Sequence, residues 1–162
     1  MFAIIKIPVK GRCDFMKVII DADACPVKDI VEKETKDKNI EVVLVSSLSH
    51  FSSKELASHV KAIYVDAGPD AADYRIVQLA EAGDIIVTQD YGLASLLLPK
   101  GCKVLHHTGF EYNKMNMDYM LETRHMSSVI RRGGGRTKGP KALSQDDKNA
   151  FLKTFQQAIV SK

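Results

Sequence analysis

The residues best suited to chemistry in this sequence are aspartates placed next to apolar runs. Asp21 follows the run at residues 18–20, with Asp23 two positions further on; Asp90 follows another run within TQDYG, and Asp73 lies near the start of a helical stretch. Carboxylates that gather repel one another, which raises their pKa values unless cations bind among them. Mg²⁺ and Mn²⁺ prefer such oxygen ligands and retain bound water. We therefore predict that these four aspartates bind Mg²⁺ or Mn²⁺.

Three other aspartates have ordinary structural explanations. Asp70 falls in the predicted first turn of a helix, where the helix dipole favours a carboxylate by roughly 0.3–1 kcal/mol. Asp66 is typical of a turn residue. Asp84 falls at the start of its predicted strand, so it should lie at the opposite end of the sheet from the metal-binding aspartates.

Apolar runs alternate with helical stretches along the chain, and this alternation is what should position the aspartates. Strands are predicted at residues 17–20, 41–45, 62–65, 84–88 and 103–105. Helices are predicted at residues 26–38, 54–59, 69–82 and 93–98, with Pro26 and Pro69 as first helical residues. The pattern predicts a three-layer α/β fold with a mostly parallel central sheet of about five strands. In such sheets ligands bind at the carboxyl ends of the strands.

Two more helices are predicted after the last strand. Residues 113–130 are helical in pattern and rich in methionine, and residues 144–160 form an amphipathic helix with Ser144 as its N-cap. We expect these C-terminal helices to pack on the core. Residues 16–162 then form a single domain.

Composition limits the class of protein. The chain has 162 residues, 45% of them hydrophobic, and a net charge of only +3, so attraction to nucleic acid must come from local patches. Its three cysteines form no C-x-x-C pair, which argues against a disulfide framework or zinc site and favours the cytoplasm. The apolar start of the chain is broken by Lys6 and Pro8, so no membrane span is expected. Residues 1–15 are either an extension upstream of a functional start at Met16 or an edge strand at 3–7.

A basic, glycine-rich segment at residues 131–141, RRGGGRTKGPK, separates the last two predicted helices; we call it the basic arm. It is suited to following a phosphate backbone, which predicts substrate contacts from Arg131, Arg132, Arg136 and Lys138. It is not a Walker loop, because Pro140 stands where the lysine is required. It contains no aromatic residue, so base stacking must come from elsewhere or be absent. An ordinary solvated linker is the alternative.

The segments KVIIDADACPVK, GPDAADYRIVQLAEAGDIIVTQDYGLA and RRGGGRTKGPK closely resemble the YaiI/YqxD family of uncharacterised bacterial proteins, from residue 16 to the C-terminus. The middle segment also resembles PIN and NYN nuclease domains, where acidic residues end the first strand, lie on a helix and follow a later strand. This second resemblance implies a PIN-like fold. It makes Asp21, Asp73 and Asp90 catalytic and places the Thr88 hydroxyl beside the metal.

The nuclease resemblance implies metal-assisted hydrolysis of a phosphodiester. RNA would be the leading substrate, ahead of DNA. Arg75, on the same helical stretch as Asp73, would contact phosphate or form a salt bridge with Asp70 or Asp73. The sequence leaves the oligomeric state open, a dimer included.

Two other classes of protein remain open. IIDADACPV is similar to the opening of haloacid dehalogenase-like phosphatases, which would make Asp21 a nucleophile and Asp23 a general acid. Position 25 is Cys rather than Thr or Val, and Gly83-Asp84 precedes a strand instead of following one, which argues against this class. A non-catalytic RNA-binding or ribosome-associated module is the other alternative, with a purely structural acidic cluster.

Overall fold

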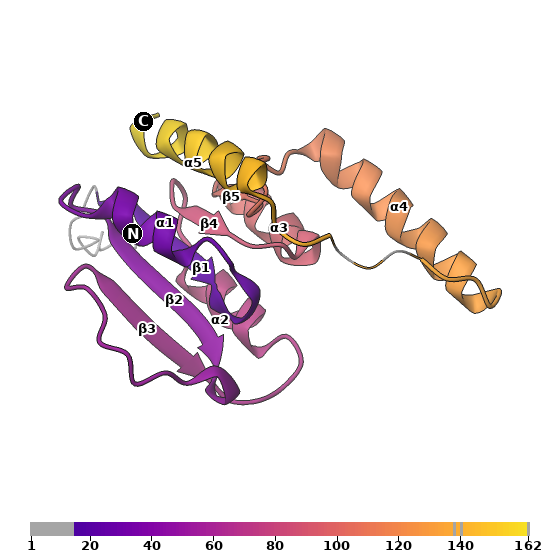
Figure 1. Cartoon of the computed structure of the whole chain (residues 1–162), viewed down its shortest axis with the longest axis horizontal. Helices are drawn as coiled ribbons and strands as arrows, with labels where there is room; N and C mark the ends of the chain where they lie inside the picture. Colours follow the sequence, from indigo (N-terminus) through magenta and orange to yellow (C-terminus); the bar gives the residue numbers. More distant parts are fainter. Residues whose placement is uncertain (1–14, 138, 140, 162) are drawn as a thin grey trace, which may run out of the picture.

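The structure is a computed structural model that describes residues 15–137, 139 and 141–161. Five parallel strands form one sheet in the order β3-β2-β1-β4-β5 (Figure 1). Their bounds are β1 Lys17–Asp21, β2 Glu41–Ser47, β3 Val60–Val65, β4 Ile85–Val87 and β5 Lys103–Leu105. The predicted extension at residues 1–15, and the alternative strand at 3–7, lie outside the described residues apart from Phe15.

Helices cover both faces of the sheet, which gives the predicted three layers. Strand β1 shows why: Val18 and Ile20 point to one face and Ile19 to the other, and all three are fully buried. The first face is covered by α1 (Lys28–Thr35) and α5 (Gln145–Val160), and the second by α2 (Ala71–Leu79) and α3 (Tyr91–Leu97). No described helix combines the length and apolar character that crossing a lipid bilayer requires.

The two C-terminal helices pack on the core to different extents. Helix α5 buries Phe151 and Phe155 against the sheet, whereas α4 (Lys114–Arg132) buries only Met117. The rest of α4 leads away from the sheet, and its far end projects beyond the other elements (Figure 1). An Asn113–Asn116 capping box begins α4, and the first glycine after it is Gly133.

A close approach fixes the position of α5. Gly109, in the loop after β5, has φ +99°, and a Cβ atom there would lie 2.5 Å from the backbone carbon of Ala150. The Thr154 hydroxyl donates to the Gly109 carbonyl across the same contact, at 2.6 Å. Only glycine therefore allows this loop to lie directly on α5.

Several predicted boundaries were wrong. Residues 54–59 form no helix, because a helix of six residues is not stable without packing against other elements. A short 3₁₀ turn, η2 (Leu48–His50), comes earlier in the same connection. Pro26 and Pro69 lie in the turns before α1 and α2 instead of opening those helices. Helix α4 also continues through Arg131 and Arg132, so the predicted arm loses its first two residues to a helix.

Candidate active site

The candidate site lies where the strand order reverses. From β1 the chain builds outward to β2 and β3, then returns to the other side of β1 for β4 and β5. A crevice opens beyond the carboxyl ends of two strands at such a point. Asp21 is the last residue of β1, and Asp90 comes shortly after β4, as the N-cap of α3. The predicted carboxylates therefore come from both sides of the reversal.

Thr88 connects these two aspartates. It is 2% exposed, and its hydroxyl donates to Asp21 Oδ2 at 3.1 Å while accepting from the Asp90 backbone N–H at 3.0 Å. The buried Tyr112 hydroxyl donates to the Thr88 carbonyl at 3.3 Å and so holds the segment between β4 and α3 in place. Thr88 therefore orients the carboxylate of Asp21 and fixes the backbone of Asp90.

Asp90 has a structural function as well as a position near Asp21 and Asp73. Its Oδ1 accepts from the backbone N–H groups of Gly92 at 2.7 Å and Leu93 at 3.3 Å, which caps α3. Because both bonds use one oxygen, the carboxylate is held in a single orientation with its second oxygen free of the cap.

Asp73 completes the group from the first turn of α2. Its pKa is raised to about 6, first by burial and then by the charges of Asp90, Asp21 and Asp70 and a side-chain hydrogen bond with Asp90. Burial also raises the pKa of Asp21, against the lowering effect of the Thr88 hydrogen bond, and the charges of Asp23 and Asp90 add to the increase. These carboxylates therefore lie close enough together that the charge of one disfavours the ionisation of another.

The donor set has the chemistry of a hard-cation site, because a divalent ion relieves the repulsion that adds to the effect of burial on the pKa of Asp73. In the described part of the chain, however, no three His, Cys, Asp or Glu side chains already surround a point where an ion could sit. The aspartates are neighbours, but their side chains are not arranged as the ligands of one ion. Binding of Mg²⁺ or Mn²⁺ stays a prediction.

Asp23 has two partners that the sequence did not suggest. Its Oδ1 accepts from the Ser47 backbone N–H at 2.9 Å and lies 3.0 Å from His50 Nδ1, and Ser47 Oγ lies 3.0 Å from that same nitrogen. The register of β1 with β2 pairs Asp21 with Val45, which brings Ser47 level with Asp23. Nothing in a polar loop of serines signals this pairing. Only the register reveals it.

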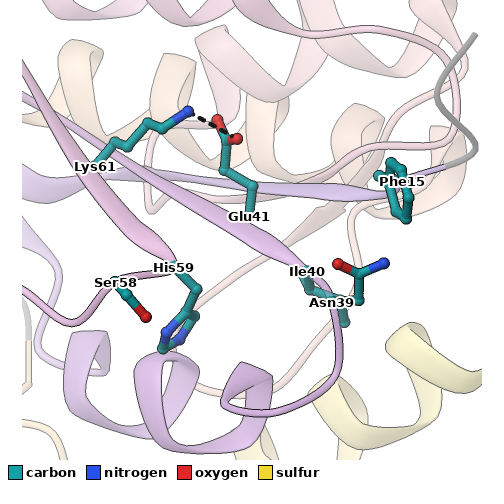
Figure 2. A pocket seen from close by; sticks show the side chains of 7 residues that line it. All are labelled: Phe15, Asn39, Ile40, Glu41, Ser58, His59 and Lys61. Atoms are coloured by element: carbon teal, nitrogen blue, oxygen red, sulfur yellow. Dashed lines mark hydrogen bonds and ion pairs between the residues drawn. The ribbon is translucent and has the colours of Figure 1, made fainter.

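A crevice between β1, β2 and α2 contains most of these groups. It is lined by Asp21, Asp23, Ser47, Val65, Gly68 and residues 70–73. A second hollow lies at the opposite, amino end of the sheet, where Figure 2 shows Lys61 and Glu41 paired at 3.0 Å near His59. Asp84 also lies at that far end, as predicted, and accepts from the Lys17 backbone N–H there. The two ends are therefore chemically distinct.

The predicted basic contacts are dispersed. Arg75 donates to Gln78 within α2, at 3.3 Å, and forms neither of the ion pairs considered for it. Arg131 and Arg132 are exposed at the end of α4 and Arg136 is exposed just beyond it, whereas Lys138 lies outside the described residues. Arg124, another basic residue of α4, has its guanidinium 5.2 Å from the centre of the Tyr91 ring, beside Asp90.

Comparisons with known proteins identify the relatives of this fold. A model of the uncharacterized BCR, YaiI/YqxD family matches residues 19–161. A UPF0178 protein of Oceanobacillus iheyensis is 62% identical over 144 residues, which is 89% of this chain and 99% of the relative. A UPF0178 protein of Bacillus thuringiensis subsp. konkukian and one of Bacillus anthracis are each 54% identical over the same length and the same shares. No solved structure matches significantly.

These matches define a family of small α/β proteins with near full-length similarity. The chain belongs to the YaiI/YqxD family.

Proposed function

We propose that this protein is a metal-dependent phosphodiesterase that acts on single-stranded RNA. The observation that carries the proposal is the meeting of Asp21, Asp73 and Asp90 from three separate elements, where burial and the neighbouring carboxylate charges raise the pKa of Asp73 to about 6. Structural carboxylates usually have partners that lower their pKa values. This group of aspartates has too few such partners, and a bound cation would supply the missing positive charge.

Each side chain has a distinct part in the proposed site. Asp21 and Asp90 are oriented by Thr88 and by the α3 cap, so they would hold Mg²⁺ or Mn²⁺, with Asp73 approaching from α2. When bound, the metal supplies a more acidic water and stabilises charge on the leaving oxygen. The resemblance to PIN and NYN nuclease domains supports the same assignment of these aspartates.

RNA is proposed as substrate from the charge distribution and from that resemblance. Between Thr123 and Leu143 the chain has six Lys or Arg residues and no acid. Several of them stand exposed on the projecting end of α4, where they could follow a phosphate backbone. An acidic metal site and a basic surface on one chain together suit cleavage of a polyanion.

The test is hydrolysis by the purified chain of single-stranded RNA, duplex DNA and a phosphomonoester, each with Mn²⁺, Mg²⁺ or chelator. We expect Mn²⁺-dependent cleavage of RNA that falls more than about 100-fold in Asp21→Asn and in Asp90→Asn. Asp66→Asn is the matched control, because Asp66 follows β3 at the same edge of the sheet but is exposed and does not line the crevice. Cleavage that survives chelator or Asp21→Asn contradicts the proposal.

A second readout does not depend on activity. Because a ligand that binds only the folded state stabilises it, Mn²⁺ should raise the melting temperature of the wild-type chain and of Asp66→Asn, and should not raise that of Asp21→Asn. RNA binding without hydrolysis or metal stabilisation would instead favour a non-catalytic RNA-binding module. Hydrolysis of the phosphomonoester alone would favour a phosphatase.

A further inference from the structure

An exposed aromatic pair lies at the same end of the sheet as the candidate active site. Phe51 is 64% exposed, and its ring centre lies 5.0 Å from that of Tyr64 with the two planes at 54°. The Tyr64 hydroxyl holds the pair in place, since it donates to the Ser52 carbonyl at 3.4 Å and lies 3.4 Å from the Ser52 backbone N–H. Phe51 is therefore a large apolar ring held at the surface.

The pair is connected to the crevice through the chain neighbour of Phe51. Phe51 follows His50, whose ring contacts Asp23, and Asp23 lines the crevice. The register of β2 with β3 pairs Ser46 with Tyr64, which places Tyr64 level with the carboxyl end of the sheet. Its side chain points to the face opposite that of the crevice residue Val65, so we expect a chain of nucleotides with one phosphate in the crevice to reach the rings past His50.

We propose that Phe51 and Tyr64 form a stacking site for an unpaired nucleobase next to the acidic crevice. The inference rests on the proposed function for its choice of ligand and adds the surface that reads the bases. Aromatic rings stack on the face of any base, so the site tolerates sequence but excludes duplex, in which neighbouring bases already cover those faces. The basic region between Thr123 and Leu143 has no aromatic residue and cannot supply this contact itself.

The surroundings offer groups that a nucleotide can use. The loop that carries Phe51 also contains Ser49, Ser52, Ser53 and the exposed Lys54, which offer hydroxyl groups and a positive charge to ribose and phosphate. Leu48 and Leu56 on the same stretch are also exposed, so the test must separate stacking on a base from general apolar contact.

The experiment measures binding of the full-length chain to a fluorescein-labelled oligoadenylate RNA and to an abasic ribose-phosphate oligomer of equal length, by anisotropy in chelator. Alanine in place of a stacking aromatic typically weakens binding by about 5- to 100-fold. We expect that loss for Phe51→Ala with oligoadenylate and no loss with the abasic oligomer. Phe51→Tyr should restore binding, and Phe51→Leu, which keeps apolar surface without a ring, should not.

Tyr119→Ala is the matched control, because Tyr119 is 70% exposed on α4 and does not line the acidic crevice. The inference is overturned if Phe51→Ala weakens both oligomers equally or neither, or if the wild-type chain does not prefer oligoadenylate. Because the assay excludes metal and hydrolysis, the two proposals can fail separately. Ring-dependent binding without any hydrolysis would contradict only the proposed nuclease activity. Hydrolysis without ring-dependent binding would contradict only the proposed stacking site.

Discussion

Asp73 shows, at the scale of one residue, how the neighbouring carboxylates of the candidate site affect one another. Its pKa is raised from 3.8 to about 6 by burial and by the charges of Asp90, Asp21 and Asp70. The folded state therefore binds a proton here more tightly than the unfolded state does. The stabilisation from that proton is complete below pH 3.8 and is lost as the pH rises through about 6.

Replacing Asp73 with Asn should stabilise the metal-free protein at pH 8. The amide removes the repelled charge and can still donate to Asp90, so we expect a gain on the order of 1 kcal/mol, after discounting for solvent screening at this half-buried position. Thermal unfolding in chelator should show the gain shrinking as the pH falls from 8 toward 4.5. Asp66→Asn should give no such pH dependence; a lower melting temperature for Asp73→Asn at pH 8 would contradict the explanation.

Individual residues were predictable where the chain positions them locally. Asp21, Thr88 and Asp90 follow buried strands, and strand direction alone sends them to one edge of the sheet. His50 was missed because its contact with Asp23 depends on the pairing of β1 with β2, which sequence patterns do not report. Arg75 was expected near the carboxylates, but a neighbouring glutamine in its own helix binds it instead.

At the scale of elements, α3 and the candidate site share one residue. Asp90 caps the helix through Oδ1 and belongs to the acidic group through its charge. Asn retains an oxygen that can accept from the same two backbone N–H groups, whereas Ala retains none. The two substitutions therefore separate the cap from the charge.

Asp90→Ala should cost about 1 kcal/mol of stability, and Asp90→Asn should cost little or nothing, because only the first loses the cap. Urea unfolding at neutral pH in chelator measures both. RNA cleavage, by contrast, should be lost in both variants, since both remove the charge. Equal destabilisation by Asn and Ala would mean that α3 does not depend on this cap.

A second prediction concerns the loop that contacts α5. Gly109→Ala places a methyl group 2.5 Å from the Ala150 backbone at φ +99°, so we expect a loss of about 2–4 kcal/mol. Gly83→Ala is the control, since Gly83 has a similar φ of +93° but nothing within 4 Å of its added Cβ. It should cost only about 1 kcal/mol. Similar losses for both variants in urea unfolding would show that the contact with α5 is not tight.

The order of elements was more predictable than their ends. Alternating apolar and helical patterns gave all five strands and the three-layer class, because buried parallel strands are continuous apolar runs. The helix predicted at 54–59 failed because it lacked a partner to pack on, which no local pattern can report. Helix α4 runs past its predicted end because nothing breaks it before Gly133.

At the scale of the whole molecule, charge is segregated. Carboxylates gather at the crevice between β1, β2 and α2, whereas exposed arginines stand on the projecting end of α4 (Figure 1). The net charge of +3 conceals this separation. An RNA strand that reaches both regions would gain affinity from the basic surface and place a phosphate at the acidic one.

Replacing Arg131, Arg132 and Arg136 together with Ala should weaken RNA binding and lower its salt dependence. For three phosphate contacts on a single strand, the slope of log K against log salt should fall by up to about 2. Replacing the exposed Lys33, Lys36 and Lys38 around the end of α1 removes the same charge from another surface and should leave the slope nearly unchanged. Equal effects of the two triple variants would indicate nonspecific attraction.

The central strand of the sheet is also the first of the described strands to be synthesised. Strand β1 pairs with β2 on one side and with β4 on the other, and the Asp21–Thr88 hydrogen bond joins residues 67 positions apart. A nascent chain therefore carries Asp21 for some time before translation supplies Thr88 and Asp90. Contacts this distant close slowly. Whatever the acidic group does, it does only once most of the polypeptide has left the ribosome.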